Sequence, residues 1–174
     1  RRVKRDVLKE LAPKRRLVQE IDWDDKVYRE LMAPVADQLR LLRNTDDPSR
    51  RALIEDAICQ RQRQATGIAK APFAAFVRAL VEAGEKVLLM AHHHTVMDIY
   101  KKELKALRPG FITGRETDKQ KETAADNFMQ GKTDLLCLSL RSASGLNLQR
   151  ATCVVFGELD WSPAGPSQAQ GRPA

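Results

Sequence analysis

The chain has 174 residues, of which 43% are hydrophobic and 30% are charged, a composition that is ordinary for a soluble globular protein with one main core. No apolar run approaches the roughly 20 residues of a membrane-spanning helix, and no apolar segment follows the basic N-terminus, so we expect an intracellular protein without a membrane partner. The net charge of +7 fits an anionic partner, with nucleic acid first, and fits a solvated basic face equally well. The three cysteines are far apart along the chain and support neither a disulfide framework nor a zinc site.

Helical periodicity dominates the first third of the chain. Between residues 24 and 43, apolar side chains recur at steps of three and four, and Pro34 should kink the predicted helix. Asp47 as a cap and Pro48 at the first helical position predict a further helix. We therefore expect residues 1–65 to form a helical linker or protrusion and residues 66–174 to form the main domain.

From Thr66 onward, helical and strand-like segments alternate. A helical stripe stops at Gly84; further helices are predicted near Thr95 and Asp98, which resemble a capping box, and over residues 118–130. Short apolar runs at 87–91, 111–113, 134–140 and 152–156 are typical of strands buried on both faces. This alternation predicts an α/β fold, in which helices cover the faces of a mostly parallel sheet.

Polar loops follow the predicted strands, at the edge where parallel sheets bind ligands. The first loop has three consecutive histidines; adjacent side chains point to opposite sides and cannot all bind one metal, so the loop is either a solvated turn or a phosphate contact. Gly114 opens a second loop that either simply caps a helix or holds a phosphate at the helix N-terminus. The small residues of RSASGLN, residues 141–147, suit either a closely approaching ligand or a crossover beneath a helix.

Two segments resemble parts of a nucleotide site but fail its requirements. Gly131 and Lys132 match the end of a phosphate-binding P-loop, yet they lack its earlier glycine and follow a predicted helix, so we interpret them as a helix end and a turn. Glu158 and Asp160 follow an apolar strand, as magnesium ligands often do. Because no P-loop accompanies them, we interpret both as solvated carboxylates. A self-contained P-loop kinase built on these segments would have to bind Mg-ATP tightly without further parts.

In their order along the chain, these segments resemble the second RecA-like lobe, the helicase C-terminal domain, of Snf-type superfamily 2 DNA translocases. RRVKRDVLKELAPK is similar to the phrase that leads into that lobe, and TGIAKA to the start of its first helix. VLLMAHHHTVMDIYKKEL resembles motif IV, and FITGRETDKQKETAADNF resembles the segment in which the family has I.G.T followed by arginine and phenylalanine. LSLRSASGLNLQRATCVVFGELDWSPAGPSQAQGR resembles motif V, the W.P phrase and the start of motif VI.

The resemblance implies a RecA-like three-layer fold and a role for individual residues. The implied DNA contacts are His92, His93, His94, Gly114, Lys121, Ser139, Arg141 and Ser142. The implied ATP-facing residues are Gly145, Asn147, Gln168 and Arg172, and Arg172 would be catalytic by stabilising charge on the transferred phosphoryl group. The chain has no P-loop and no DExH sequence, so the resemblance implies that a first lobe supplies the Mg²⁺ ligands, and that this chain alone binds no nucleotide tightly and hydrolyses no ATP.

Three departures from the family pattern affect these expectations. Lys121 stands where the family usually has arginine, which keeps the charge but loses the two-pronged hydrogen bonding of a guanidinium. Gly171 replaces an acidic residue, and the sequence stops at Ala174, before the second motif VI arginine, so we expect a fragment of a longer polypeptide.

The function predicted from the sequence is that of the C-terminal motor lobe of an ATP-dependent double-stranded DNA translocase, of the remodelling or annealing-helicase type. Its expected partners are double-stranded DNA and the first RecA-like lobe. Its expected location is the nucleoid of a bacterium or the nucleus of a eukaryote. The alternative is a non-catalytic RecA-like module that binds DNA or a protein.

Overall fold

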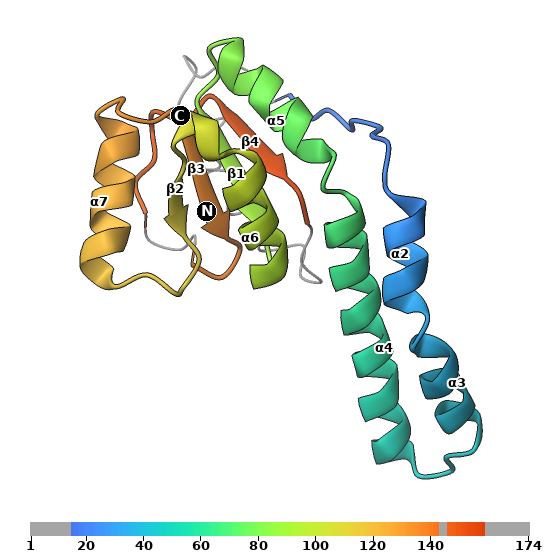
Figure 1. The fold of residues 1–174 in the computed structure, drawn as a ribbon. Coiled ribbons are helices and arrows are strands. Elements are labelled where there is room, and N and C mark those ends of the chain that lie inside the picture. Colours follow the sequence, from blue (N-terminus) through green and yellow to red (C-terminus); the bar gives the residue numbers. More distant parts are fainter. Residues whose placement is uncertain (1–14, 143–145, 159–174) are drawn as a thin grey trace.

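The computed structural model describes residues 15–142 and 146–158, and its central element is a four-stranded parallel sheet (Figure 1). The strands are β1 (Val87–Ala91), β2 (Gly110–Ile112), β3 (Leu135–Ser139) and β4 (Cys153–Phe156), in the spatial order β2-β3-β1-β4. Their bounds lie within one residue of the predicted strands. The predicted parallel sheet is therefore confirmed.

Helices cover both faces of this sheet. The helices α5 (Phe73–Glu82) and α6 (His94–Glu103), with a short 3-10 turn η1 (Lys105–Leu107), lie on one face, and α7 (Asp118–Met129) lies on the other (Figure 1). Every residue of β1 and β3 is buried. Because successive strand residues point to opposite faces, Leu89 packs against α5 and α6 while Leu88 packs toward α7. The three-layer α/β architecture is thus confirmed.

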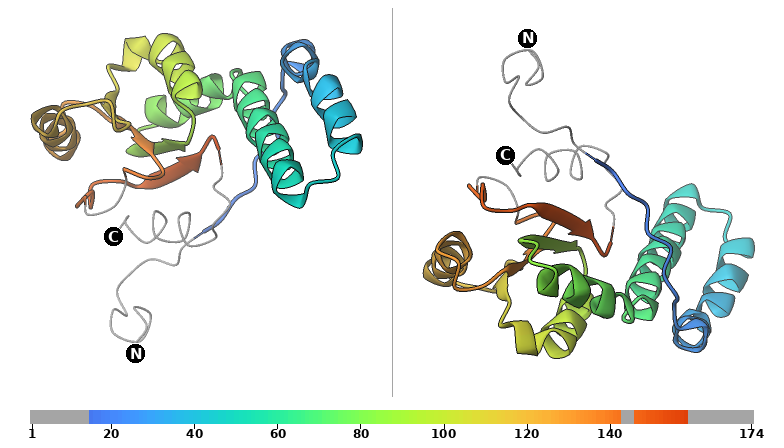
Figure 2. Two further views of the ribbon diagram at one scale, coloured as in Figure 1. Left: turned by 90° about the horizontal axis from the view of Figure 1, so that it is seen from below. Right: turned by 90° about the horizontal axis from the view of Figure 1, so that it is seen from above.

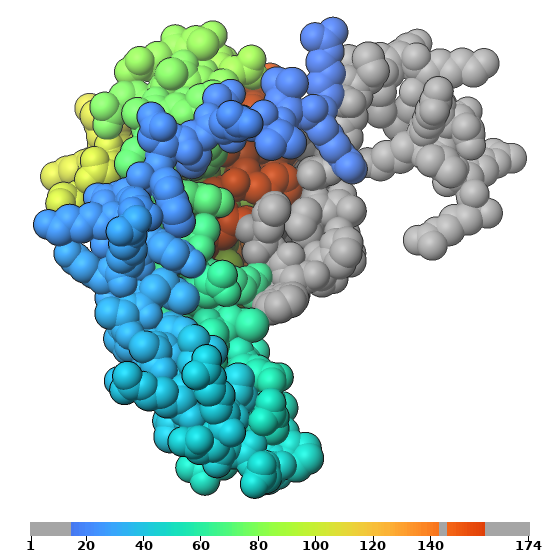
Figure 3. Space-filling model, turned by 90° about the vertical axis from the view of Figure 1, so that its right-hand side faces the viewer, coloured from blue at the N-terminus to red at the C-terminus, as the bar shows by residue number. Residues whose placement is uncertain are grey.

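The first described helices form an arm that protrudes from the sheet domain (Figures 2 and 3). The arm comprises α2 (Asp25–Met32), α3 (Val35–Arg43) and α4 (Pro48–Ala69), and both shorter helices pack on α4. At Pro34 the chain breaks between α2 and α3, so the predicted kink is a full interruption. Asp47 caps α4 as predicted, since its carboxylate accepts a hydrogen bond of 3.0 Å from the Ser49 N–H.

The long helix α4 extends from the arm into the sheet domain. It runs without a break through residues 65 and 66, where the division into linker and main domain is predicted, and its buried residues are Ala65, Gly67 and Ala69. These three lie in its last turns, so only that end of α4 is enclosed by other parts of the fold. The division at 65 stays a prediction. No helix in the described part of the chain combines the length and apolar character needed to cross a membrane.

The ends of α7 agree with the sequence prediction, whereas the start of α6 does not. Thr117 and Gln120 form a capping box at the start of α7, and Gly131, with φ of 78°, follows its end, which confirms the helix end and turn at Gly131 and Lys132. The predicted capping box at Thr95 and Asp98 is wrong. Helix α6 begins at His94, so Thr95 lies inside it, and the cap residue His93 makes no side-chain cap hydrogen bond. The carboxylate of Glu158, which follows β4, accepts from the N–H groups of His92 and His93 just before the helix.

Candidate nucleic-acid interface

The polar loops that follow the four strands meet at one edge of the sheet. The parallel register pairs Ala91 with Ser139, Ile112 with Leu138 and Met90 with Phe156, so all four strands end at nearly the same height. The histidine loop, the loop at Gly114, the loop at Arg141 and the exit at Glu158 are therefore neighbours. This is the edge at which parallel sheets commonly bind their ligands.

Glu158 binds the histidine loop from the neighbouring strand exit. Its carboxylate accepts hydrogen bonds from the backbone N–H groups of His92 (2.7 Å) and His93 (2.9 Å), and it lies 2.6 Å from Nδ1 of the His93 ring. Glu158 is only 8% exposed. The interpretation of Glu158 as a solvated carboxylate is therefore wrong, and so is the solvated-turn interpretation for His93. The carboxylate thus satisfies the backbone donors of the two residues that precede α6.

Two glycines allow other elements to approach this carboxylate closely. A Cβ on Gly67 of α4 would lie 2.5 Å from Oε1 of Glu158, so α4 reaches this edge only because residue 67 has no side chain. A Cβ on Gly157 would overlap the hydroxyl of Tyr100, a fully buried side chain of α6. Burial, and after it the charge of Glu158, raises the pKa of Tyr100. We call Gly67, His93, Tyr100, Gly157 and Glu158 the Glu158 cluster.

The loop after β2 is closed by a second glutamate. The Glu116 carboxylate accepts hydrogen bonds from the Thr113 N–H (2.6 Å), the Thr113 hydroxyl (2.9 Å) and the Gly114 N–H (3.1 Å). Burial raises the pKa of Glu116, but these hydrogen bonds outweigh that effect and hold it below its usual value. The carboxylate therefore stabilises the loop fully above its usual pKa, and this contribution falls as the pH drops through the lowered value.

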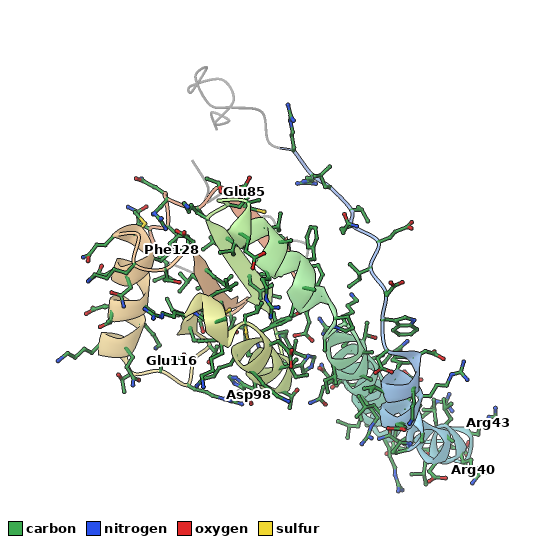
Figure 4. The ribbon with its side chains drawn as sticks, turned by 45° about the horizontal axis from the view of Figure 1, so that its top comes forward. Arg40, Arg43, Glu85, Asp98, Glu116 and Phe128 are labelled. Atoms are coloured by element: carbon green, nitrogen blue, oxygen red, sulfur yellow. The ribbon has the colours of Figure 1, made fainter. Side chains whose placement is uncertain are left out.

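One ion pair links this loop to α6, and another lies within the first turn of α7. Arg115 forms an ion pair of 2.8 Å with Asp98 of α6, and Lys121 pairs at 2.9 Å with Asp118 on the first turn of α7. Glu116 and Asp98 lie at the same end of the domain, whereas Glu85 and Phe128 lie at the opposite end (Figure 4). Both pairs are exposed at the surface, so solvent screens them and they contribute little to stability.

The loop after β3 presents a cation at the same edge. Arg141 is exposed and forms no ion pair with another described residue, while Ser139 is buried, with 6% exposure. Leu140 donates its backbone N–H to Ala91 of β1, which holds this loop beside the histidine loop. A Cβ on Gly114 would lie 3.5 Å from the Ser142 hydroxyl, so the loops after β2 and β3 are in contact.

Most of the predicted DNA contacts are thus neighbours, while the predicted ATP contacts are largely not described. The structure brings His92, His93, His94, Gly114, Ser139, Arg141 and Ser142 to one edge, with Lys121 on the helix that starts there. Of the predicted ATP-facing residues only Asn147 is described, and it is exposed; Gly145, Gln168 and Arg172 lie outside the described residues.

Metal ligation has no support from the donor set at this edge. Within residues 15–142 and 146–158, no three histidine, cysteine or carboxylate side chains are grouped so as to hold a metal ion. The described residues therefore do not fit a Mg²⁺ site.

The sequence comparisons identify relatives of the SWI/SNF-related kind. A protein of Drosophila melanogaster, "SWI/SNF-related matrix-associated actin-dependent regulator of chromatin subfamily A-like protein 1", is 27% identical over 180 residues, which cover 99% of this chain and 23% of that protein. The protein of the same name from Bos taurus is 35% identical over 137 residues, covering 72% of this chain and 15% of that protein. The chain thus spans less than a quarter of the length of these relatives.

Solved structures share the fold. The "Sulfolobus solfataricus SWI2/SNF2 ATPase C-terminal domain" superposes with a TM-score of 0.68 at 14% identity, covering 82% of this chain and 71% of that one. The "Sulfolobus solfataricus SWI2/SNF2 ATPase core in complex with dsDNA" also superposes with a TM-score of 0.68, at 13% identity, covering 86% of this chain and 36% of that one. These likenesses identify the architecture as that of a RecA-like C-terminal lobe. Since the family model of the helicase conserved C-terminal domain matches residues 72–174, the chain belongs to the helicase C-terminal domain family, among SWI/SNF-related members.

Proposed function

We propose that this chain is the C-terminal motor lobe of an ATP-dependent double-stranded DNA translocase. The observation that carries the proposal is the convergence of four strand-end loops at one edge, where Arg141 and His94 are exposed and Ser142 lies against Gly114. An exposed guanidinium and backbone N–H groups are suitable partners for DNA phosphates. Under this proposal residues 66–174 are the lobe and residues 1–65 a helical linker or protrusion, and the protein works in a nucleoid or a nucleus.

Under this proposal only the complete protein, with its first lobe, binds and hydrolyses ATP. The chain has no P-loop of its own, so a first lobe would hold the triphosphate and Mg²⁺, and ATP would supply the closure energy that moves this lobe along one strand. Asn147 is exposed where it would face the nucleotide, and Arg172 would stabilise phosphoryl charge. The relatives' names and the DNA complex of a similar ATPase core support the DNA partner.

The central test compares this chain with a version covalently joined to the first lobe of its own protein. We expect negligible ATP hydrolysis by the 174-residue chain and DNA-stimulated turnover by the joined protein. Substituting Arg172→Ala in the joined protein should remove turnover while duplex binding persists. Robust ATPase activity from the chain alone would overturn the proposal, and DNA binding without turnover in the joined protein would favour a non-catalytic binding module instead.

Glu116 offers a test of the DNA interface itself. Its negative charge lies at Gly114 and Thr113, so Glu116→Gln should tighten binding of a 20-base-pair duplex about fivefold, which corresponds to about 1 kcal/mol of removed repulsion. Glutamine retains an oxygen that can accept from the Gly114 N–H, so the loop should persist. The measurement is fluorescence anisotropy at low salt, where phosphate contacts are strongest.

The matched control for this substitution is Glu122→Gln, an exposed residue of α7 outside the loop. It removes the same charge and should change duplex affinity by less than about twofold if the effect depends on position. Equal effects of the two substitutions would mean that net charge alone is responsible. Unchanged or weaker binding by the Glu116 variant would exclude its loop from the DNA interface.

A further inference from the structure

A basic groove lies along β2, between α6 and α7. Its volume is about 630 Å³, and its walls come from α6, from residues 108–111 and from α7 with its flanking turns. Volumes of this size, about 300–1,000 Å³, hold small ligands or a few residues of peptide. We call this feature the β2 groove.

The floor of the β2 groove is the edge of a sheet. In the order β2-β3-β1-β4, β2 has β3 on one side and no strand among the described residues on the other, and Figure 1 shows it on the side of α7. Gly110 and Phe111 of β2 both line the groove. Because α6 and α7 cover opposite faces of the sheet, the space between them leaves this edge accessible. An open strand edge offers alternating backbone donors and acceptors to another extended chain.

Positive charge surrounds this edge along its whole length. Lys119 lies in the first turn of α7, near the carboxyl end of β2, whereas Lys132 and Arg108 lie near its amino end. Lys101 lies between them, with its ammonium 5.8 Å from the centroid of the Phe111 ring. None of the four cations forms an ion pair with a described residue.

One acidic side chain in this groove offsets only part of the charge of those cations. Glu116 also lines the β2 groove, but its carboxylate is engaged by the backbone N–H groups of Thr113 and Gly114. Four unpaired cations therefore face one carboxylate whose oxygens already accept hydrogen bonds. The charge complement of the groove is an anionic ligand.

We propose that the β2 groove binds an extended, acidic peptide segment, which adds as a strand to the free edge of β2. A strand of three residues spans about 10 Å, so a core of three to five peptide residues would pair with the edge, and acidic side chains on either side would reach the lysines and the arginine. A peptide suits this floor better than a nucleic acid does, because the sugar-phosphate backbone lacks N–H donors at the spacing of a strand. The inference is independent of the proposed motor function.

The direct test uses a fluorescein-labelled decapeptide of alternating glutamate and valine, titrated with the 174-residue chain and followed by anisotropy. We expect saturable binding that weakens with salt. The double substitution Lys119→Glu and Lys132→Glu should weaken it at least tenfold. The matched control is Lys26→Glu with Arg50→Glu on the arm; it makes the same change in net charge at exposed sites and should leave the affinity within about twofold.

Two further measurements separate strand addition from simple attraction between charges. N-methylation of alternate amides in the decapeptide removes backbone donors and should abolish binding. Bound peptide should slow amide exchange at the one of the two neighbours Phe111 and Ile112 whose N–H points away from β3. If the methylated peptide binds as well as the parent, strand addition is wrong. A ten-nucleotide single strand serves as a competitor of the peptide. If it competes equally well, and if the Lys119→Glu and Lys132→Glu variant alone binds it more weakly, the groove is a nucleic-acid surface and the peptide proposal is overturned.

Discussion

Replacing Glu158 with alanine should lower the free energy of unfolding of the chain by about 3–5 kcal/mol, the largest effect we expect from a single polar substitution. The change removes the acceptor of the His92 N–H, the His93 N–H and the His93 ring, and it leaves these partly buried groups without a partner in the cluster. Urea unfolding followed by far-ultraviolet circular dichroism measures the loss. Glu55→Ala, at an exposed position of α4, should stay within about 0.5 kcal/mol.

Graded substitutions test whether the hydrogen bonds carry this effect. Glu158→Gln keeps one acceptor oxygen and should recover part of the lost stability. A double-mutant cycle with His93→Ala should give a coupling energy of about 1–3 kcal/mol, because the two side chains share one contact. Additive losses in the cycle would mean that the contact with the His93 ring contributes nothing, and that the carboxylate stabilises the fold through the backbone N–H groups of His92 and His93 or through packing at Gly67.

The Glu158 cluster also connects the stability of the domain with its proposed DNA contacts. Glu158 belongs to the exit of β4, His93 to the exit of β1 and Gly67 to the helix that leads to the arm. A weakened cluster should therefore loosen the histidine loop before the sheet unfolds, and duplex affinity should fall in the Glu158→Gln variant under conditions where its circular dichroism is unchanged.

The strands and helices could be predicted from the sequence because each has its own local signal. The apolar run at 87–91 is too short for a helix and fully buried as a strand, and the Asp47 and Pro48 pair starts α4 through contacts within one turn. The same local reasoning failed at Thr95, because the helix begins at His94, and the N–H groups of His92 and His93 just before it bind a residue more than sixty positions away. A capping pattern cannot reveal such a partner.

The composition of the Glu158 cluster depends on tertiary structure in the same way. Glu158 is polar and follows an apolar strand, so the sequence predicts that it is exposed to solvent. It is buried because β1 and β4 are adjacent in the sheet. A contact between Glu158 and the histidine loop could have been predicted from a parallel sheet, since parallel strands that end together bring the residues after them into contact. The roles of Gly67 and Tyr100 had no comparable signal, because a close approach between α4 and α6 depends on how whole helices pack.

Replacing Gly157 with alanine should destabilise the sheet domain by about 3 kcal/mol. The new Cβ would overlap the Tyr100 hydroxyl and lie 3.1 Å from Cζ of that ring, and Tyr100 cannot move away because it is fully buried among α6 and the sheet. Urea unfolding again gives the loss in free energy. Gly84→Ala is an informative contrast: no atom lies within 4 Å of its Cβ, so its cost reflects only the backbone φ of 93°.

The partner substitution Tyr100→Phe decides whether the hydroxyl is the cause. This hydroxyl has no hydrogen-bond partner among the described residues, so removing it should leave stability unchanged or raise it by about 1 kcal/mol. In the Gly157→Ala background the same change should restore about 2 kcal/mol, because only the milder contact with the ring carbon remains. If Tyr100→Phe instead destabilises both proteins equally, the hydroxyl contributes a favourable interaction of its own, and the requirement for glycine at 157 has another origin than the overlap with Tyr100.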